Sequence, residues 1–258
     1  MSIRAYCWKF TMSTPPHTTP LTSAPAFDTP LTTVDLVVFT LQDGALKVLL
    51  VQRRDHPEEP FPNAWALPGG FVDVHRDASL QACAQRKLKE KTGVDSPYLE
   101  QLGGWGNATR DPRGWSATHV YFTLLPIAGV TLQAGGNSQA AQWFAVDQEL
   151  PTHSLAFDHA DILMAAIHRL RAKVEYTSLP AHLLSPPFTL PQLQRAYEQV
   201  LGRAVDKSAF RTRMLAAGFL EETGPMDVGA PRLAMGYRLS DNQTVAYFPR
   251  TFSPRGEC

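Results

Sequence analysis

Between residues 33 and 146 the chain alternates short apolar runs with turn-forming residues, which is the pattern of β-strands. The first run, residues 33–41, is β-branched and apolar, as expected of a buried strand. Asp43 and Gly44 then give a turn signal, and residues 46–53 supply the returning strand. Further strands are predicted at residues 65–72, 98–103, 118–125 and 141–146.

Two segments of this half have the periodicity of helices. The first, residues 79–92, starts at Ser79, which suits an N-cap, and ends before Gly93, which suits a helix stop. The second spans residues 158–173. One helix embedded among strands predicts an α+β sandwich and not a regular series of βαβ units.

The pattern changes beyond residues 176–187, a stretch with three prolines and little periodicity, where we place a domain boundary. Thr189 and Asp206 are each suited to cap a helix, over residues 190–201 and 207–217. Two short strands are then predicted at residues 233–239 and 244–248 and are expected to pair as a hairpin. Helix, short turn, helix and hairpin is the order of a winged helix-turn-helix.

Composition narrows the class of protein only in part. A hydrophobic content of 44% allows a proper core, and a formal net charge of zero neither favours nor excludes nucleic acid as a partner. No apolar run approaches the roughly 20 residues that cross a bilayer, so no membrane partner is expected. Three scattered cysteines without metal-ligand spacing, and no recognisable export signal, predict a cytoplasmic location.

The segment Gly69-Gly-Phe-Val72, with the helix that ends Arg86-Lys-Leu-Lys-Glu-Lys-Thr-Gly-Val94, resembles the Nudix box. That pattern is Gly, five residues, Glu, seven residues, then Arg-Glu-apolar-x-Glu-Glu-x-Gly-apolar. The resemblance implies a Nudix fold. Most members hydrolyse nucleoside diphosphates linked to another group, using divalent cations held by the helix carboxylates.

The residues on this helix do not suit that chemistry. Positions 87, 90 and 91 share one helix face, and three carboxylates there would hold Mg²⁺. This chain has Lys87, Glu90 and Lys91 instead. An ammonium group about 4 Å from a cation site repels the cation by several kcal/mol at an effective dielectric of about 20. Lys87 and Lys91 could instead face the phosphates of a ligand.

The earlier glutamate of the pattern is missing as well. Alignment by the helix puts Ala78 in its place, and alignment by the glycine puts Arg76 there, with Asp73 and Asp77 as nearby acids. We therefore predict no catalytic residues, no metal and no cofactor in this degenerate box, with Mg²⁺ at Glu90 only if some hydrolase activity remains. The residues of the box are Gly70, Arg86, Lys87, Glu90 and Lys91.

A second distinctive segment is Arg110-Asp-Pro-Arg-Gly-Trp115, which has turn chemistry and offers two guanidinium groups and a carboxylate. Guanidinium groups suit phosphates or stack on a base, and a carboxylate suits ribose hydroxyls. The segment resembles one in the Nudix-related transcriptional regulators of NAD metabolism, the NrtR family, whose pocket binds ADP-ribose or related NAD derivatives. The predicted ligand-binding residues are Arg53, Phe71, Lys87, Arg110, Asp111 and Arg113.

Residues 155–159, 188–202 and 206–211 resemble the same family, so the resemblance covers about residues 33–248. It implies a Nudix-like α/β/α sandwich followed by a winged helix-turn-helix domain. The predicted organisation is a disordered tail at 1–30, a ligand-sensing domain at 31–175, a DNA-binding domain at 176–250 and a tail at 251–258.

The second helix of the C-terminal part has two distinct faces. Phe210 and Met214 are spaced to face the core, whereas the other face is short, polar and basic, as a helix in the major groove requires. Reading two half-sites needs two copies, so the expected partners are a second copy of the chain and a double-stranded DNA operator. The predicted DNA-binding residues are Arg203, Lys207, Ser208, Arg211, Thr212 and Arg232.

Three functions are open at this point. The first is a ligand-responsive transcriptional regulator, a repressor of NAD metabolism whose degenerate Nudix domain senses ADP-ribose or a related nucleotide. The second is a magnesium-dependent Nudix hydrolase of ADP-ribose or a similar nucleoside diphosphate. The third is a Nudix-related regulator that responds to a pentose. Lys87 and Lys91 favour a regulator over an enzyme.

Overall fold

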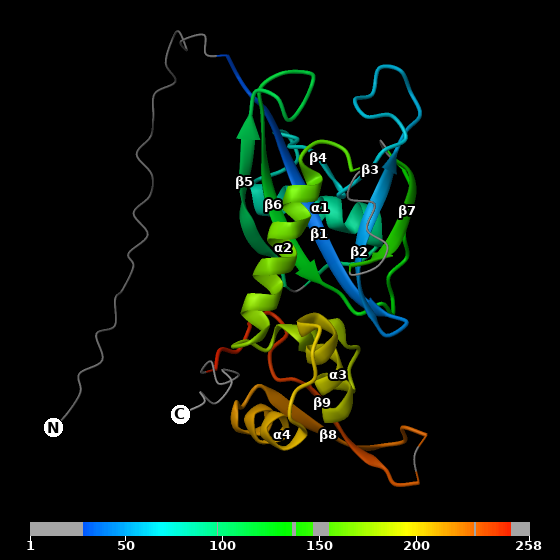
Figure 1. The fold of residues 1–258 in the computed structure, drawn as a ribbon, viewed down its shortest axis with the longest axis vertical. Coiled ribbons are helices and arrows are strands. Elements are labelled where there is room, and N and C mark those ends of the chain that lie inside the picture. The colour runs from blue at the N-terminus through cyan, green and yellow to red at the C-terminus, as the bar shows by residue number, and fades with distance from the viewer. Residues whose placement is uncertain (1–27, 97, 136–137, 147–154, 230, 249–258) are drawn as a thin grey trace, which may run out of the picture.

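Figure 1 shows the fold in a computed structural model, which describes residues 28–96, 98–135, 138–146, 155–229 and 231–248. The tails predicted at 1–30 and 251–258 lie outside these residues, except for residues 28–30. Within the described part of the chain, no helix combines the length and the apolar character needed to span a membrane.

The N-terminal part is built on one seven-stranded sheet with the order β3-β2-β1-β6-β5, in which β4 also pairs with β1 and β7 with β2. Strands β1 and β6 are parallel, and the other pairs are antiparallel. The strands are β1 (Leu31–Gln42), β2 (Ala45–Arg53), β3 (Trp65–Ala66), β4 (Gly69–Phe71), β5 (Glu100–Asn107), β6 (Ser116–Leu124) and β7 (Ser138–Ala145).

Two helices cover opposite faces of this sheet, α1 (Leu80–Thr92) and α2 (His159–Val174). Successive side chains of a strand point to opposite faces. Accordingly, Leu36 of β1 belongs to the cluster around α1, whereas its neighbour Val37 belongs to the cluster around α2. Because both faces are covered, β1 is apolar without interruption from Leu36 to Phe39, and the predicted α/β/α sandwich is confirmed.

The prediction of one strand at residues 65–72 is wrong in one respect, because the structure has two short strands there, β3 and β4. Strand β3 pairs with β2, and β4 pairs with β1. Between them the Leu67 backbone N–H donates to Nδ1 of His159 at 2.9 Å, and the Pro68 carbonyl accepts from Leu36 N–H at 2.8 Å. Proline cannot donate to a ladder, so the chain changes partner at this point.

The C-terminal part contains a 3₁₀ helix η2 (Leu179–Leu183), then α3 (Leu190–Leu201), α4 (Lys207–Ala216), β8 (Leu220–Met226) and β9 (Ala234–Leu239). The predicted helix starts are confirmed. Thr189 and Gln192 form a capping box at α3, and the Asp206 side chain accepts from Ala209 N–H at α4. This order of elements is a winged helix-turn-helix.

The predicted hairpin is wrong in its partner strand. Strand β9 pairs with β8 and not with residues 244–248. The segment of β8, Leu-Glu-Glu-Thr-Gly-Pro-Met, lacks the alternation by which strands are recognised. Residues 244–248 instead run back along residues 176–178, where Phe248 N–H donates to the Tyr176 carbonyl at 3.0 Å.

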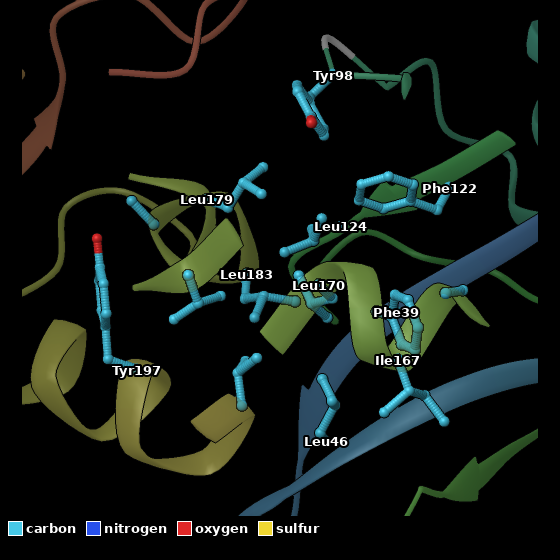
Figure 2. Close-up of a cluster of buried hydrophobic side chains, with 14 of the residues drawn as sticks. Phe39, Leu46, Tyr98, Phe122, Leu124, Ile167, Leu170, Leu179, Leu183 and Tyr197 are labelled. Atoms are coloured by element: carbon cyan, nitrogen blue, oxygen red, sulfur yellow. The ribbon is translucent and has the colours of Figure 1, made fainter. Parts of the chain in front are cut away.

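The segment predicted as a domain boundary is buried where the two parts meet. All five residues of η2 are buried. Figure 2 shows Leu179 and Leu183 of this helix in one apolar cluster with Phe122 of the sheet, Leu170 of α2 and Tyr197 of α3. The two parts therefore share a continuous core, and the C-terminal part packs against one end of the sandwich (Figure 1).

Candidate functional site

A cavity of about 990 Å³ opens beside β1, β4 and α1. The structure brings together all the residues that we predicted to bind a ligand, because each of the six lines this cavity. The residues of the degenerate Nudix box line the same space. The predicted ligand residues in the lining are Arg53, Phe71, Lys87, Arg110, Asp111 and Arg113.

Phe71 and Arg113 form a flat, half-exposed surface in the cavity. The guanidinium carbon of Arg113 lies 5.0 Å from the centroid of the Phe71 ring. The buried carboxylate of Asp111 fixes that guanidinium, with Arg113 Nε and Nη2 donating at 3.0 and 2.7 Å. A ring and a guanidinium held in this way suit a planar base or a phosphate.

Asp111 therefore serves to hold the guanidinium of Arg113 in place. Burial raises the pKa of Asp111, but the hydrogen bonds and the charge of Arg113 outweigh burial and hold this pKa below its ordinary value. The side chain of Asp111 is only 3% exposed, whereas that of Arg113 is 38% exposed. The cavity thus presents the guanidinium and keeps the carboxylate behind it.

Arg110 is bound mainly by the protein itself. Its Nε and Nη2 atoms donate to the two oxygens of Asp158 at 2.9 and 2.7 Å, and Nη1 donates to Ser116 Oγ at 3.3 Å. Burial lowers the pKa of Arg110, but the hydrogen bonds and charge of Asp158 more than compensate and raise it. Most N–H groups of Arg110 are therefore unavailable to a ligand.

Arg53 is also buried and engaged. Its Nε donates to the Pro60 carbonyl at 2.7 Å, and its Nη2 pairs with Glu59. The guanidinium lies over the ring of Phe157, 5.1 Å from the centroid. Burial lowers the pKa of Arg53 despite the opposing charge of Glu59. Arg53 therefore secures the proline-rich loop of residues 57–62 against the pocket.

The sequence analysis missed a buried polar pair at the back of the cavity. Asp35 of β1 lies with its Oδ2 atom 3.5 Å from Nε2 of His159 and 3.9 Å from Nη2 of Arg110. Burial raises the pKa of Asp35, but His159, Thr118 and Arg110 together lower it overall. Because His159 accepts through Nδ1, its ring proton lies on Nε2, which faces Asp35.

The sequence does contain a hint of Asp35, because it is the one charged residue in a mostly apolar strand. Its partner could not be found in the same way, because His159 is 124 positions away in the sequence. Gly69 completes the arrangement, since a Cβ atom there would lie 2.0 Å from Oδ1 of Asp35. Glu59, Phe157 and Asp158 were also missed, because the sequence does not show which residues each of them contacts in the folded protein.

The charged face of α1 does not fit a divalent cation. Asp77, with its side chain buried, accepts from Arg86 at 2.7 and 2.6 Å, so the acid nearest the missing glutamate is already neutralised. Glu90 also pairs with Arg86, at 3.0 Å. Among the residues the structure describes, no three His, Cys, Asp or Glu side chains converge as metal ligands.

The residues predicted to contact DNA lie on the surface of the C-terminal part. Phe210 and Met214 of α4 are buried, as expected. Arg203 has its Nη2 atom 3.5 Å from Oε1 of Glu175, and Arg232 is exposed between β8 and β9. The exposed residues of α4 among those predicted are Lys207, Ser208, Arg211 and Thr212.

Comparisons with known proteins divide the chain in the same way. The family model of the NUDIX domain matches residues 30–166, and that of the NrtR DNA-binding winged helix domain matches residues 180–239. The chain is 46% identical, over 87% of its own length and 88% of the relative's, to an ADPR responsive transcriptional repressor NtrR of Acinetobacter baylyi.

Two solved structures of Shewanella oneidensis NrtR are similar to this chain. One is a complex with a 27mer DNA, with a TM-score of 0.75 and 40% identity over 86% of this chain and 99% of that one. The other is the NUDIX domain complexed with ADP ribose, with a TM-score of 0.51 and 44% identity over 58% of this chain and 94% of that one.

Proposed function

This chain belongs to the NrtR family, which joins a NUDIX domain to a DNA-binding winged helix, and we propose that it represses transcription in response to ADP-ribose. It is a homologue of an ADP-ribose-responsive transcriptional repressor. Ligand binding in the NUDIX domain would weaken operator binding only if the two states of the protein differ in ligand affinity.

One observation carries the ligand assignment. The Phe71–Arg113 surface and the ammonium group of Lys87 line the same cavity. An aromatic and guanidinium surface suits the base or ribose end of a nucleotide, whereas an ammonium group suits its phosphates. The cavity volume lies within the range of pockets that enclose ligands of this size.

The DNA-binding half of the proposal rests on α4. Its exposed face carries Lys207 and Arg211 one helical turn apart, with Ser208 and Thr212 beside them. The cations suit phosphates, and the short polar side chains suit base edges. We propose that Arg203 and Arg232 add contacts to the DNA backbone, and that two copies bind a near-palindromic operator. We also propose a cytoplasmic location, because such a regulator works beside the chromosome.

A hydrolase of ADP-ribose is the alternative that shares this pocket. It is disfavoured because the helix face that would hold Mg²⁺ carries two lysines and one glutamate already paired with Arg86. A regulator responding to a pentose is the other alternative, but a pentose offers the ammonium group of Lys87 no anion, and Lys87 would keep only the distant Glu90, 3.9 Å away.

To test this proposal, genomic DNA fragments are pulled down with the full-length protein, once with and once without ADP-ribose. We expect specific fragments to be retained and ADP-ribose to release them. Thermal-shift measurements with ADP-ribose, NAD and pentoses run in parallel. Stabilisation by a pentose alone would refute the nucleotide assignment, and robust magnesium-dependent release of AMP from ADP-ribose would instead favour the enzyme.

A further inference from the structure

We propose that the pocket holds the diphosphate of its ligand with protein ammonium groups in place of divalent cations, and that Lys87 is the direct phosphate ligand. The inference rests on the proposed function, because it takes ADP-ribose as the ligand. It goes beyond that function because it says which chemical groups hold the phosphates. Four features of the described residues support it.

The first feature is the position of Lys87. A Cβ atom on Gly70 would lie 3.1 Å from Nζ of Lys87, so the ammonium group occupies the space that this glycine leaves open beside β4. Gly70 has φ +145, a conformation that side chains rarely adopt, which keeps the position a glycine. The ammonium group is therefore held at the cavity wall.

The second feature is that Lys87 lacks a close partner. Its Nζ lies 3.9 Å from Oε2 of Glu90 and makes no hydrogen bond to any residue that the structure describes. Glu90 is itself engaged by Arg86 at 3.0 Å through its other oxygen. The Lys87 side chain is only 18% exposed, so water solvates this charge poorly and an anionic ligand would complete its contacts.

The third feature is the contrast with Lys91. Its Nζ donates to the Gly135 carbonyl and to Ser138 Oγ, both at 2.7 Å. Lys91 is thereby tied to the chain that follows residue 133, and its backbone carbonyl accepts from Gln133 N–H at 3.0 Å. Lys91 thus shapes the cavity wall and adds positive charge, whereas Lys87 keeps its donors for the ligand.

The fourth feature is the local excess of positive charge. Arg76 lines the same cavity and forms no ion pair with the residues that the structure describes. Burial lowers the pKa of Lys91, and the neighbouring charge of Lys87 lowers it further. Positive groups crowded in this way repel a divalent cation and attract a dianion such as a diphosphate.

The experiment measures binding of ADP-ribose to the full-length protein by calorimetry, in a chelator and again in excess Mg²⁺. We expect the same affinity in both conditions. Lys87→Gln should lower the affinity about tenfold or more, because it removes a charged hydrogen-bond donor. Its circular dichroism spectrum and thermal unfolding should match those of the parent protein.

Lys89→Gln is the matched control, because Lys89 belongs to the same helix but pairs with Asp95 on the surface at 2.7 Å. It should leave the affinity nearly unchanged. Affinity that is lost in the chelator and restored by Mg²⁺ would overturn the inference and leave the proposed function standing. So would a Lys87→Gln protein with the affinity of the parent. Failure of ADP-ribose to bind in either condition would refute the proposed function itself.

Discussion

Asp158, the residue immediately before α2, turns its carboxylate away from the helix it precedes and accepts two hydrogen bonds from Arg110. The start of α2 is thereby joined to the loop that carries Arg113 in the pocket. At the other end of the same helix, Arg171 Nε donates to the Val200 carbonyl of α3 at 3.1 Å. One helix of 16 residues therefore contacts both the pocket and the DNA-binding part.

Replacement of Arg110 tests its role as an anchor. Arg110→Ala leaves the carboxylates of Asp158 and Asp35 without their cation, and breaking a buried pair of this kind costs about 3 kcal/mol. We expect the free energy of unfolding in urea to fall by about that amount. Arg113→Ala is the comparison, since Arg113 is 38% exposed and its backbone N–H still donates to Asp111 at 3.0 Å after the change. The fold should therefore lose less stability than in Arg110→Ala, while ADP-ribose affinity drops more. The reverse order of the two effects would contradict our assignment.

Removal of the Phe71 ring tests the stacking surface. Stacking on an aromatic side chain is worth roughly 1–3 kcal/mol per base, so Phe71→Ala should weaken ADP-ribose binding by about tenfold. The ring is 45% exposed, and its loss should leave the thermal midpoint nearly unchanged. Phe71→Tyr keeps a ring and should bind ADP-ribose like the parent. Calorimetry on the three proteins decides, and equal affinities would eliminate the stacking surface.

Replacement of charges on α4 tests the DNA interface. Lys207→Ala and Arg211→Ala should each reduce operator affinity and lower the slope of log affinity against log salt by about one. The measurement is fluorescence anisotropy with a recovered operator fragment over a range of salt concentrations. Lys89→Ala removes the same charge from the other domain and should have no effect. An unchanged slope for both α4 variants would show that another surface contacts the phosphates.

Buried His182 predicts a pH dependence of stability. Burial lowers the pKa of His182 to about 4, and the unfolded value is about 6.5. The unfolded chain therefore binds more protons between these values, so stability is fully present above pH 6.5 and falls as the pH drops towards 4. The loss should reach about 3 kcal/mol across this window.

His182→Leu should remove that contribution to acid sensitivity. Nε2 of His182 is buried without a hydrogen-bond partner among the described residues, so an apolar replacement leaves no further polar atom unsatisfied. Urea denaturation at pH 7 and pH 5 should show a smaller difference for the variant than for the parent protein. Equal differences would mean that folding does not lower the pKa of His182.

Local signals predicted the helix boundaries well, because their causes lie within a few residues. The Ser79 side chain accepts from Ala82 N–H, and Gly93 adopts the left-handed conformation that ends α1. Thr189 and Gln192 likewise cap α3 reciprocally. Strand partners were predicted less well. The polar sequence of β8 conceals its pairing with β9, and that pairing depends on the fold around both strands.

The sequence by itself determined the charge on the α1 face, since Lys87 and Lys91 stand at positions where a metal site needs carboxylates, wherever the chain places them. Only the tertiary structure decided what each charge does. In the folded protein Lys91 donates a hydrogen bond to the Gly135 carbonyl and Arg110 pairs with Asp158, whereas Lys87 lines the cavity. Hydrogen bonds act over about 3 Å, so the partner of a charged group is set by which distant segments the fold brings into contact.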